Sequence, residues 1–205
     1  MDMETDEFLT IASSSEGIYK EKGSKFLAFA FPVESEDQAR QHLDELRNQY
    51  HDARHHCYAY LIGQEMDTHR MNDDGEPSST AGKPIFGQIR SHNVTNILIV
   101  VVRYFGGTLL GTSGLIRAYK SAAGDALSNA KIIKKTIQSY YQIRFDYSLM
   151  SSVEKILHDL DIRPREKTFE ASCIYKVGIR KNMEQKMVEQ FKRINGLHYN
   201  KIEDP

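Results

Sequence analysis

The chain has little cysteine and no long apolar segment. Its two cysteines, Cys57 and Cys173, are too few for a disulfide framework, so we expect a reducing, cytoplasmic setting. No apolar stretch is long enough to cross a bilayer, and the polar, acidic start MDMETDE is unlike a signal peptide. We therefore expect a soluble intracellular protein with no membrane partner.

Several ligand-binding motifs are also missing. The glycines of residues 106–114 follow neither the G-x-G-x-x-G nor the Walker A spacing, so they do not predict a dinucleotide-binding or ATPase site. No calcium-loop pattern or C-x-x-C pair occurs. His55 and Cys57 share one strand face and could ligate zinc, or form a nucleophile pair, but a buried thiol beside hydrogen-bonded histidines is the favoured interpretation. We expect no metal and no cofactor.

Charge differs between the two parts of the chain. Residues 134–205 hold 14 Lys and Arg against 10 Asp and Glu, whereas residues 1–133 hold 13 against 18. The length of 205 residues allows two modest cores, and we expect two domains, 1–133 and 134–205. A polyanion would meet the basic second domain first, although a solvated mixed-charge surface also explains the difference.

The first domain mixes helix and strand patterns. A capping box at Ser35 and Gln38 predicts a helix after the first strand, and Pro84 suits the first turn of a later one. The polar stretch 63–81 shows no periodicity and predicts a long loop. The remaining predicted strands are Lys25–Val33, Cys57–Ile62 and Ile97–Val102, and further helices are predicted at Gly82–Ser91 and after Gly114.

The second domain predicts a complete β-α-β-β-α-β unit. Alternation from Tyr141 to Tyr147 indicates a half-buried strand, and Ser151 with Glu154 indicates a capped helix. A hairpin follows, reaching Ile179, then a helix opened by Asn182 and a last strand at Leu197–Ile202. This order is the ferredoxin-like pattern, so the predicted fold class is α+β throughout.

A glycine-rich loop follows the buried strand Ile97–Val102. Thr112 and Ser113 are candidate helix caps, and strand, loop and helix start together offer backbone N–H groups to an anion. A tight turn that needs glycine for packing alone explains the pattern equally well. Arg103 favours the anion site, because an arginine at the end of a buried strand needs a partner or a ligand.

A second polar segment covers residues 71–84. It carries three carboxylates, three hydroxyls and a lysine between turn-forming residues. These groups could cap turns, contact a cation or phosphate, or perform acid-base chemistry.

Three separated motifs resemble the IMPACT family, namely ARHHCYAY from Ala53, DDGEPSSTAGKP from Asp73 and VVRYFGGTLLGTSG from Val101. Many members have glycine where Ser79 stands. The resemblance implies a first domain with the β-α-β fold of the second domain of a small-subunit ribosomal protein. It also implies a second domain similar to the last domain of the translocation elongation factor, as in bacterial two-domain members. Eukaryotic members regulate translation.

The resemblance implies binding positions but no catalytic residue. The positions that match the family motifs, and that we expect at one surface, are His55, Asp74, Glu76, Thr80, Gly82, Arg103, Gly106, Gly107 and Gly111. In the second domain we expect phosphate contacts from Lys134, Lys135, Arg144, Arg163, Arg165, Lys167, Arg180 and Lys181. Tyr140 and Tyr141 are candidates for stacking on bases.

The leading hypothesis is a cytosolic protein that binds RNA or a ribosomal element, or a protein partner in translation, without chemistry of its own. The alternative is an enzyme acting on a phosphorylated or nucleotide substrate, since His55, Asp74 and Glu76 suit acid-base catalysis.

Two substitutions distinguish residues needed for stability from residues needed for ligand binding. We expect Gly107→Val to cost about 1–3 kcal/mol of stability if that glycine has positive φ, and Arg103→Ala to spare stability and lose the ligand.

Overall fold

The computed structural model describes residues 6–203 except 64, 65 and 67, and divides into two compact units. Phe8–Lys135 form the first unit, and the described residues from Thr136 onward join Asp6 and Glu7 in the second. Both units combine sheets with helices, which confirms the predicted α+β class. In the described part of the chain, no helix is long and apolar enough to cross a membrane.

An antiparallel five-stranded sheet forms the middle of the first unit. The apolar run Ile97–Val102 lies on its central strand and is buried on both faces, as predicted. The strands follow the order β2 (Ser15–Glu21), β3 (Ser24–Pro32), β6 (Ile97–Tyr104), β4 (His55–Ile62) and β5 (Thr68–Asn72).

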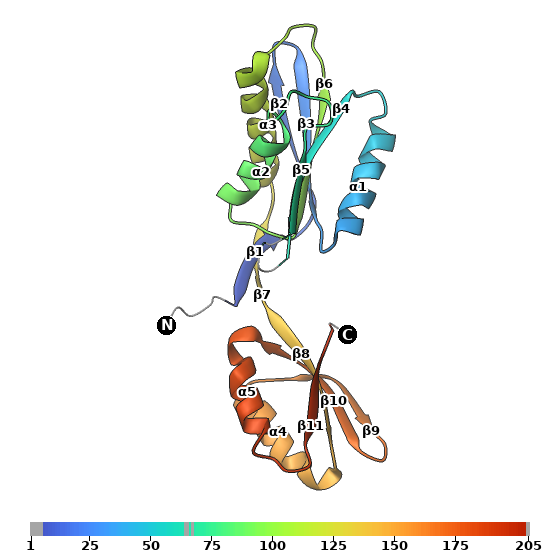
Figure 1. The fold of residues 1–205 in the computed structure, drawn as a ribbon, viewed down its shortest axis with the longest axis vertical. Helices are drawn as coiled ribbons and strands as arrows, with labels where there is room; N and C mark the ends of the chain where they lie inside the picture. Colours follow the sequence, from blue (N-terminus) through green and yellow to red (C-terminus); the bar gives the residue numbers. More distant parts are fainter. Residues whose placement is uncertain (1–5, 64–65, 67, 204–205) are drawn as a thin grey trace. The chain divides into compact units, whose positions relative to one another are not determined.

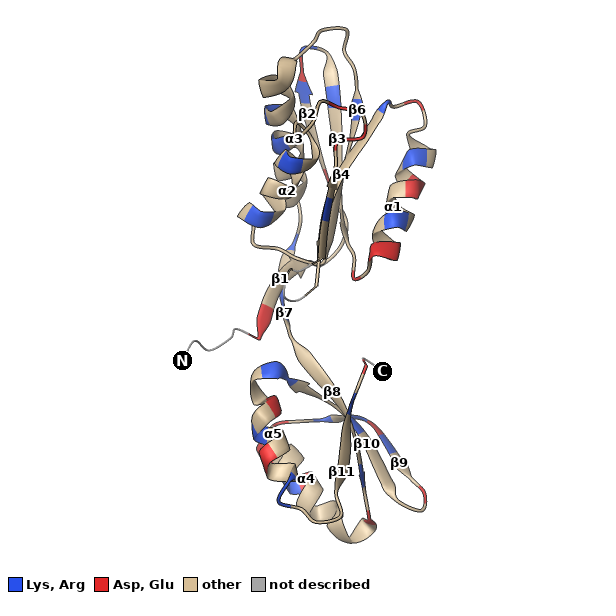
Figure 2. Ribbon diagram, viewed as in Figure 1, with Lys and Arg blue, Asp and Glu red and all other residues tan. Residues whose placement is uncertain are grey.

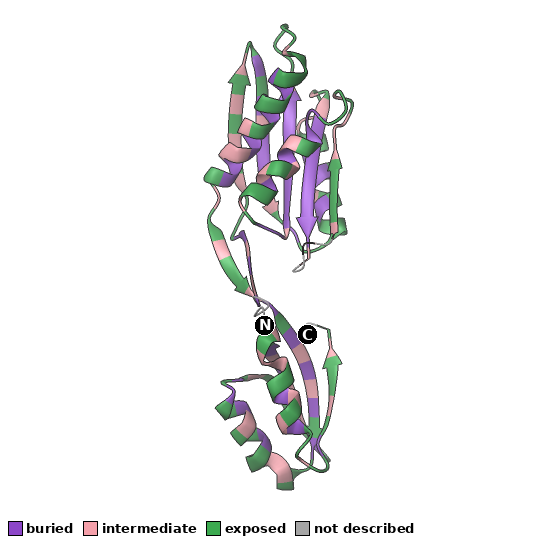
Figure 3. Ribbon diagram, turned by 60° about the vertical axis from the view of Figure 1, so that its left-hand side comes forward, coloured by how far each residue is buried: buried purple, intermediate pink, exposed green. Residues whose placement is uncertain are grey.

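Helices cover both faces of this sheet (Figure 1). Helix α1 (Glu36–Gln49) lies on one face, and α2 (Gly82–Ser91) and α3 (Gly111–Ser128) lie on the other. Each face has its own apolar cluster, and Figure 3 shows the buried strands beneath helices that expose their outer sides. The Ser35 hydroxyl accepts the Gln38 N–H at 3.2 Å, which confirms the predicted helix start.

Three predictions for the first unit need correction. The stretch expected to be a loop contains β5, which was missed because its strand structure comes from pairing with β4 and its mostly exposed residues show no apolar alternation. Helix α3 begins at Gly111 after Leu110, so Thr112 and Ser113 lie inside the helix and form no side-chain cap. A two-stranded sheet of β1 (Glu7–Ile11) and β7 (Ile132–Thr136) was not predicted, and neither was β2.

The second unit has the predicted β-α-β-β-α-β order. Its antiparallel sheet has the strand order β11-β8-β10-β9, and both helices pack on one face of it around a single apolar cluster. The elements are β8 (Gln138–Phe145), α4 (Met150–Asp159), β9 (Pro164–Phe169), β10 (Cys173–Arg180), α5 (Glu184–Phe191) and β11 (His198–Ile202).

Both helix starts in this unit differ from prediction. A 3-10 turn, Tyr147–Leu149, leads into α4, so Ser151 lies inside the helix and does not cap it. A second 3-10 turn, Lys181–Met183, leads into α5 and includes Asn182. In each case the preceding turn supplies carbonyl acceptors at the helix start, which removes the need for a side-chain cap.

Candidate functional site

The polar motifs of the first unit meet at one end of the five-stranded sheet. His55 opens β4 directly opposite Arg103, near the end of β6. The His55 ring Nδ1 lies 2.7 Å from the carbonyl oxygen of Asp74, and the backbone N–H of His56 donates to the Asp74 carboxylate at 2.7 Å. The segment after β5 is therefore tied to the first residues of β4.

Asp73, which sequence reasoning did not single out, fixes the start of α2. One of its carboxylate oxygens accepts the N–H groups of Ala81 and Gly82 at 2.9 and 2.8 Å, and the other accepts that of Ser79 at 2.8 Å. Ser79 has φ of 63°, a left-handed conformation that glycine adopts without strain.

Arg103 and Glu76 form a buried ion pair. Arg103 Nη1 lies 2.6 Å from Glu76 Oε1, and the two side chains are only 8% and 4% exposed. The Tyr119 hydroxyl donates to the same carboxylate oxygen at 2.8 Å. Arg103 also stacks over the Phe26 and Phe105 rings. The Arg103 guanidinium thus has buried partners within the first unit. This argues against the expectation that Arg103→Ala spares stability.

Cys57 belongs to the same buried cluster. Its Sγ lies 3.0 Å from the Asp73 carbonyl oxygen and 3.3 Å from the Tyr119 hydroxyl. Burial raises the pKa of the Cys57 thiol well above its ordinary value, and the nearby carboxylate of Glu76 acts in the same direction. A neutral thiol held in this way is a poor nucleophile, so the structure does not favour a catalytic role.

Alkylation tests this assignment. We expect iodoacetamide to modify Cys57 in the folded protein at least about tenfold more slowly than in urea-unfolded protein, because the thiol is buried and protonated. Mass spectrometry of the peptides measures Cys57 separately from Cys173. Fast modification of Cys57 in the folded state would restore the nucleophile hypothesis.

The two histidines beside Cys57 point to different environments. His56 is buried, and desolvation lowers the pKa of its imidazole. His55 contacts a backbone carbonyl rather than a carboxylate. Among residues 6–63, 66 and 68–203, no three His, Cys, Asp or Glu side chains come close enough together to hold a metal ion.

The glycine loop has a packed part and an open part. A Cβ on Gly106 would lie 1.9 Å from the carbonyl carbon of Gly23, so the loop backbone rests on the turn between β2 and β3. Gly107 and Gly111 have φ of 85° and 70°, and added Cβ atoms would meet no atom within 4 Å. Leu109 is 83% exposed. The loop beyond Gly106 is therefore open to a ligand.

The other expected contact residues do not gather at this loop. Thr80 is buried and donates its hydroxyl to the Pro77 carbonyl. Lys134 and Lys135 lie on β7, and Lys135 pairs with Glu34 at 3.2 Å. Arg144 belongs to the second unit, where its Nε donates to the Ser172 hydroxyl.

Some cations and one tyrosine of the second unit have internal partners. Lys167 pairs with Glu154 at 3.1 Å, and Arg180 with Asp6 at 2.9 Å. Tyr141 is only 7% exposed, and its hydroxyl donates to a carboxylate within the unit. The prediction that Tyr141 stacks on bases is therefore wrong, because its alternating strand position faces the core.

Sequence reasoning missed a cationic layer in the first unit. Residues 77–124 contain no Asp or Glu, although the chain has 28 of them. Figure 2 shows basic residues on α2 and α3, whereas α1 carries both signs. The exposed cations of this layer are Lys83, Arg90, Arg117 and Lys120. The absence of acidic residues over so long a stretch was the available signal.

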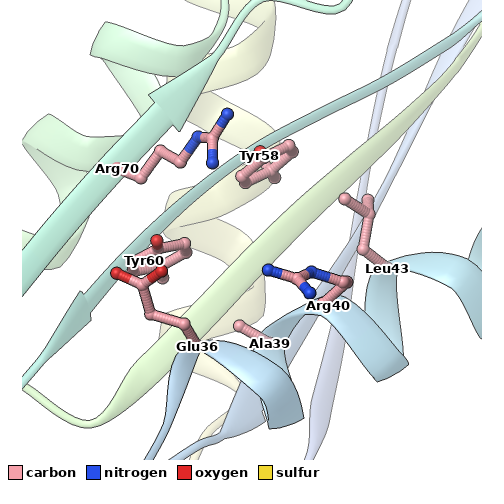
Figure 4. A pocket seen from close by; sticks show the side chains of 7 residues that line it. All are labelled: Glu36, Ala39, Arg40, Leu43, Tyr58, Tyr60 and Arg70. Carbon is pink, nitrogen blue, oxygen red and sulfur yellow. The ribbon is translucent and has the colours of Figure 1, made fainter.

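A small hollow lies between α1 and the strands β4 and β5. It measures about 50 Å³, and its lining includes Tyr58, Tyr60, Arg40 and Arg70 (Figure 4). Burial raises the pKa of Tyr60, and its hydroxyl bonds to Glu36. Tyr58 and Tyr60 belong to the ARHHCYAY motif, but none of the expected binding positions lines this hollow.

The fold and site define a two-unit α+β protein whose polar motifs meet at one sheet end beside a cationic helical layer. The family model of the Impact N-terminal domain matches residues 22–127, and the chain belongs to the IMPACT family. It is 33% identical to the IMPACT family member YigZ of Escherichia coli over 77% of this chain and 78% of that protein.

Two further comparisons extend this relationship. The chain is 35% identical to the Protein IMPACT homolog of Saccharomyces cerevisiae over 44% of this chain and 36% of that protein. A crystal structure described as a hypothetical protein is 28% identical, with a TM-score of 0.71, and covers 98% of this chain and 100% of its own. The two-unit arrangement of elements thus recurs in a solved structure.

Proposed function

We propose that the chain is a cytosolic protein that binds RNA or a ribosomal element and modulates translation. One observation carries the proposal: α2 and α3 carry the exposed cations Lys83, Arg90 and Lys120. The sequences of these two helices contain one acidic residue, Asp125. Asp125 itself accepts the backbone N–H of Ile18 at 2.8 Å. Such a surface attracts a polyanion despite the acidic character of the first domain as a whole.

The glycine loop extends this layer at one end. It leads into the first turn of α3, whose residues 111–113 are exposed and whose start has no side-chain cap. Backbone N–H groups at such a start donate hydrogen bonds to phosphate oxygens, and Lys120, further along α3, adds positive charge. Support for a translational role comes from membership of a family whose eukaryotic members regulate translation.

Removing the cationic layer tests the proposal. We expect Lys83→Gln/Arg90→Gln/Lys120→Gln to weaken co-sedimentation with ribosomes on the order of tenfold at moderate salt and to flatten its salt dependence, because phosphate contacts are lost. The matched control is Arg40→Gln/Arg70→Gln/Lys131→Gln, which removes equal charge from exposed positions outside α2, α3 and the motif residues.

Two outcomes count against the proposal. Equal weakening by both triple variants indicates a net-charge effect without a specific surface. Wild-type protein that stays in the supernatant at every salt concentration removes the ribosome association altogether. Samples treated with nuclease separate binding to RNA from binding to a protein partner.

A further inference from the structure

The sheet of the second unit has one covered face and one open face. Helices α4 and α5 both lie on the covered face (Figure 1). Along β8, Ser139, Tyr141, Ile143 and Phe145 are buried, whereas the alternate residues point to the other face and are half-buried or exposed. Those alternate residues are Gln138, Tyr140, Gln142 and Arg144.

Tyr140 and Gly178 form a cross-strand pair at the middle of the open face. The two residues are register partners on the two central strands, β8 and β10. A Cβ on Gly178 would lie 3.0 Å from Cε1 of the Tyr140 ring. The ring therefore leans across the strand where only glycine leaves room for it, and a larger residue at 178 would push it away from the sheet.

Arg165 lies over this ring and forms a layer with it. Its guanidinium carbon lies 4.5 Å from the Tyr140 ring centroid, and its Nη2 donates to the Tyr140 hydroxyl at 3.0 Å and to the Gln138 amide oxygen at 3.2 Å. Arg165 is exposed. A guanidinium placed over an aromatic ring offers a positively charged surface on which a nucleobase can stack.

A hollow of about 380 Å³ adjoins this layer. Gln138 and Gly178 line it together with Asn182, whose side chain, like that of Gln138, can donate to and accept from a base edge. Asp161 and Arg180 also line the hollow. Because Arg180 is paired with Asp6 at 2.9 Å, the Asp161 carboxylate disfavours a phosphate there. The chemistry of the lining therefore suits a base, with the phosphates lying outside.

We propose that the open face of this sheet binds single-stranded RNA, with one base stacked on the layer of Arg165 and Tyr140 and a neighbouring base in the hollow. The inference rests on the proposed function and narrows it to unpaired nucleotides. Duplex RNA keeps its bases within the helix, so it cannot use a stacking layer of this kind. Arg144 lies on the same face, four residues further along β8.

Fluorescence anisotropy of the full chain with a labelled oligo(U) strand tests this site. We expect wild type to bind the strand better than the same strand annealed to oligo(A). Tyr140→Leu and Arg165→Gln should each weaken binding to the single strand about tenfold, because each removes part of the stacking layer. Tyr140→Phe keeps the ring and should bind within about threefold of wild type.

Lys186→Gln is the matched control for Arg165→Gln, because it removes one positive charge from an exposed position on α5, the covered side. Equal weakening by these two variants, or unchanged binding by Tyr140→Leu, overturns the stacking site. Wild type that binds ribosomes but shows no preference for the single strand overturns this inference and leaves the proposed function standing. Absence of binding to ribosomes and to both oligonucleotides removes both. Circular dichroism of each variant confirms folding.

Discussion

Replacing Glu76 with glutamine is expected to lower the free energy of unfolding by about 3–5 kcal/mol, the largest loss we anticipate for a change that keeps side-chain volume. The substitution leaves the Arg103 guanidinium buried without a counter-charge, since the pair is 8% and 4% exposed. It also weakens the acceptor of the Tyr119 hydroxyl. Arg103→Ala should cost a similar amount, because it isolates the carboxylate.

A double-substitution cycle shows whether the pair acts as a unit. We expect Glu76→Gln/Arg103→Met to cost clearly less than the two single changes added together, since the double variant buries no unpaired charge. Urea unfolding followed by circular dichroism supplies the free energies, fitted as two transitions where the two units unfold separately.

An exposed ion pair provides the control. Glu34 pairs with Lys135 at 3.2 Å, and the Glu34 side chain is 68% exposed. Glu34→Gln should therefore change stability by less than about 1 kcal/mol, as surface pairs generally do. If Glu76→Gln costs no more than Glu34→Gln, the buried pair does not hold the motifs together, and Arg103 becomes available again as a ligand-binding residue.

The sequence predicted most of the fold because periodicity and caps are local signals. The buried run Ile97–Val102 and the Ser35 cap depend on neighbouring residues, and both lie where they were expected. The alternation predicted from Tyr141 to Tyr147 also marks a strand, but β8 runs from Gln138 to Phe145, and Tyr147 belongs to the 3-10 turn that follows. Strand β5 was missed because its five residues acquire strand structure from pairing with β4. No pattern within β5 itself records that pairing.

The site was harder to predict than the fold for the same reason. The motifs place His55, Asp74 and Arg103 at one sheet end, but spacing does not show whether a charged side chain faces solvent or a buried partner. Arg103 resembled a ligand-binding arginine, and only the position of Glu76, 27 residues away, reveals the ion pair. Tyr119 completes the cluster and carries no signal of its own along the chain. Asp73 opens one of the family motifs, but the motif does not show that its carboxylate binds the start of α2.

Substitutions in the glycine loop should show which glycine is needed to avoid a steric clash and which is needed for its positive φ. We expect Gly106→Ala to cost about 3 kcal/mol, the upper end of overpacking losses, because its Cβ would lie 1.9 Å from Gly23 C and 2.1 Å from Ser24 N. Both atoms belong to the backbone of a tight turn, so no side-chain rotation relieves the clash. The Gly106 N–H also donates to the Ser24 hydroxyl at 3.1 Å, and that bond is lost if the loop moves.

Gly107→Ala should cost less, about 1–2 kcal/mol, because its penalty is the positive φ of 85° alone, in open space. Gly107→Val adds a branched Cβ, and its expected loss of stability is about 1–3 kcal/mol. Urea unfolding of the three variants measures the order, and a Gly107→Ala loss larger than that of Gly106→Ala contradicts it. Glycine at 106 then serves packing, whereas 107 and 111 keep an open loop beside the cationic layer. Gly107→Ala should therefore alter ribosome binding more than its small effect on stability explains.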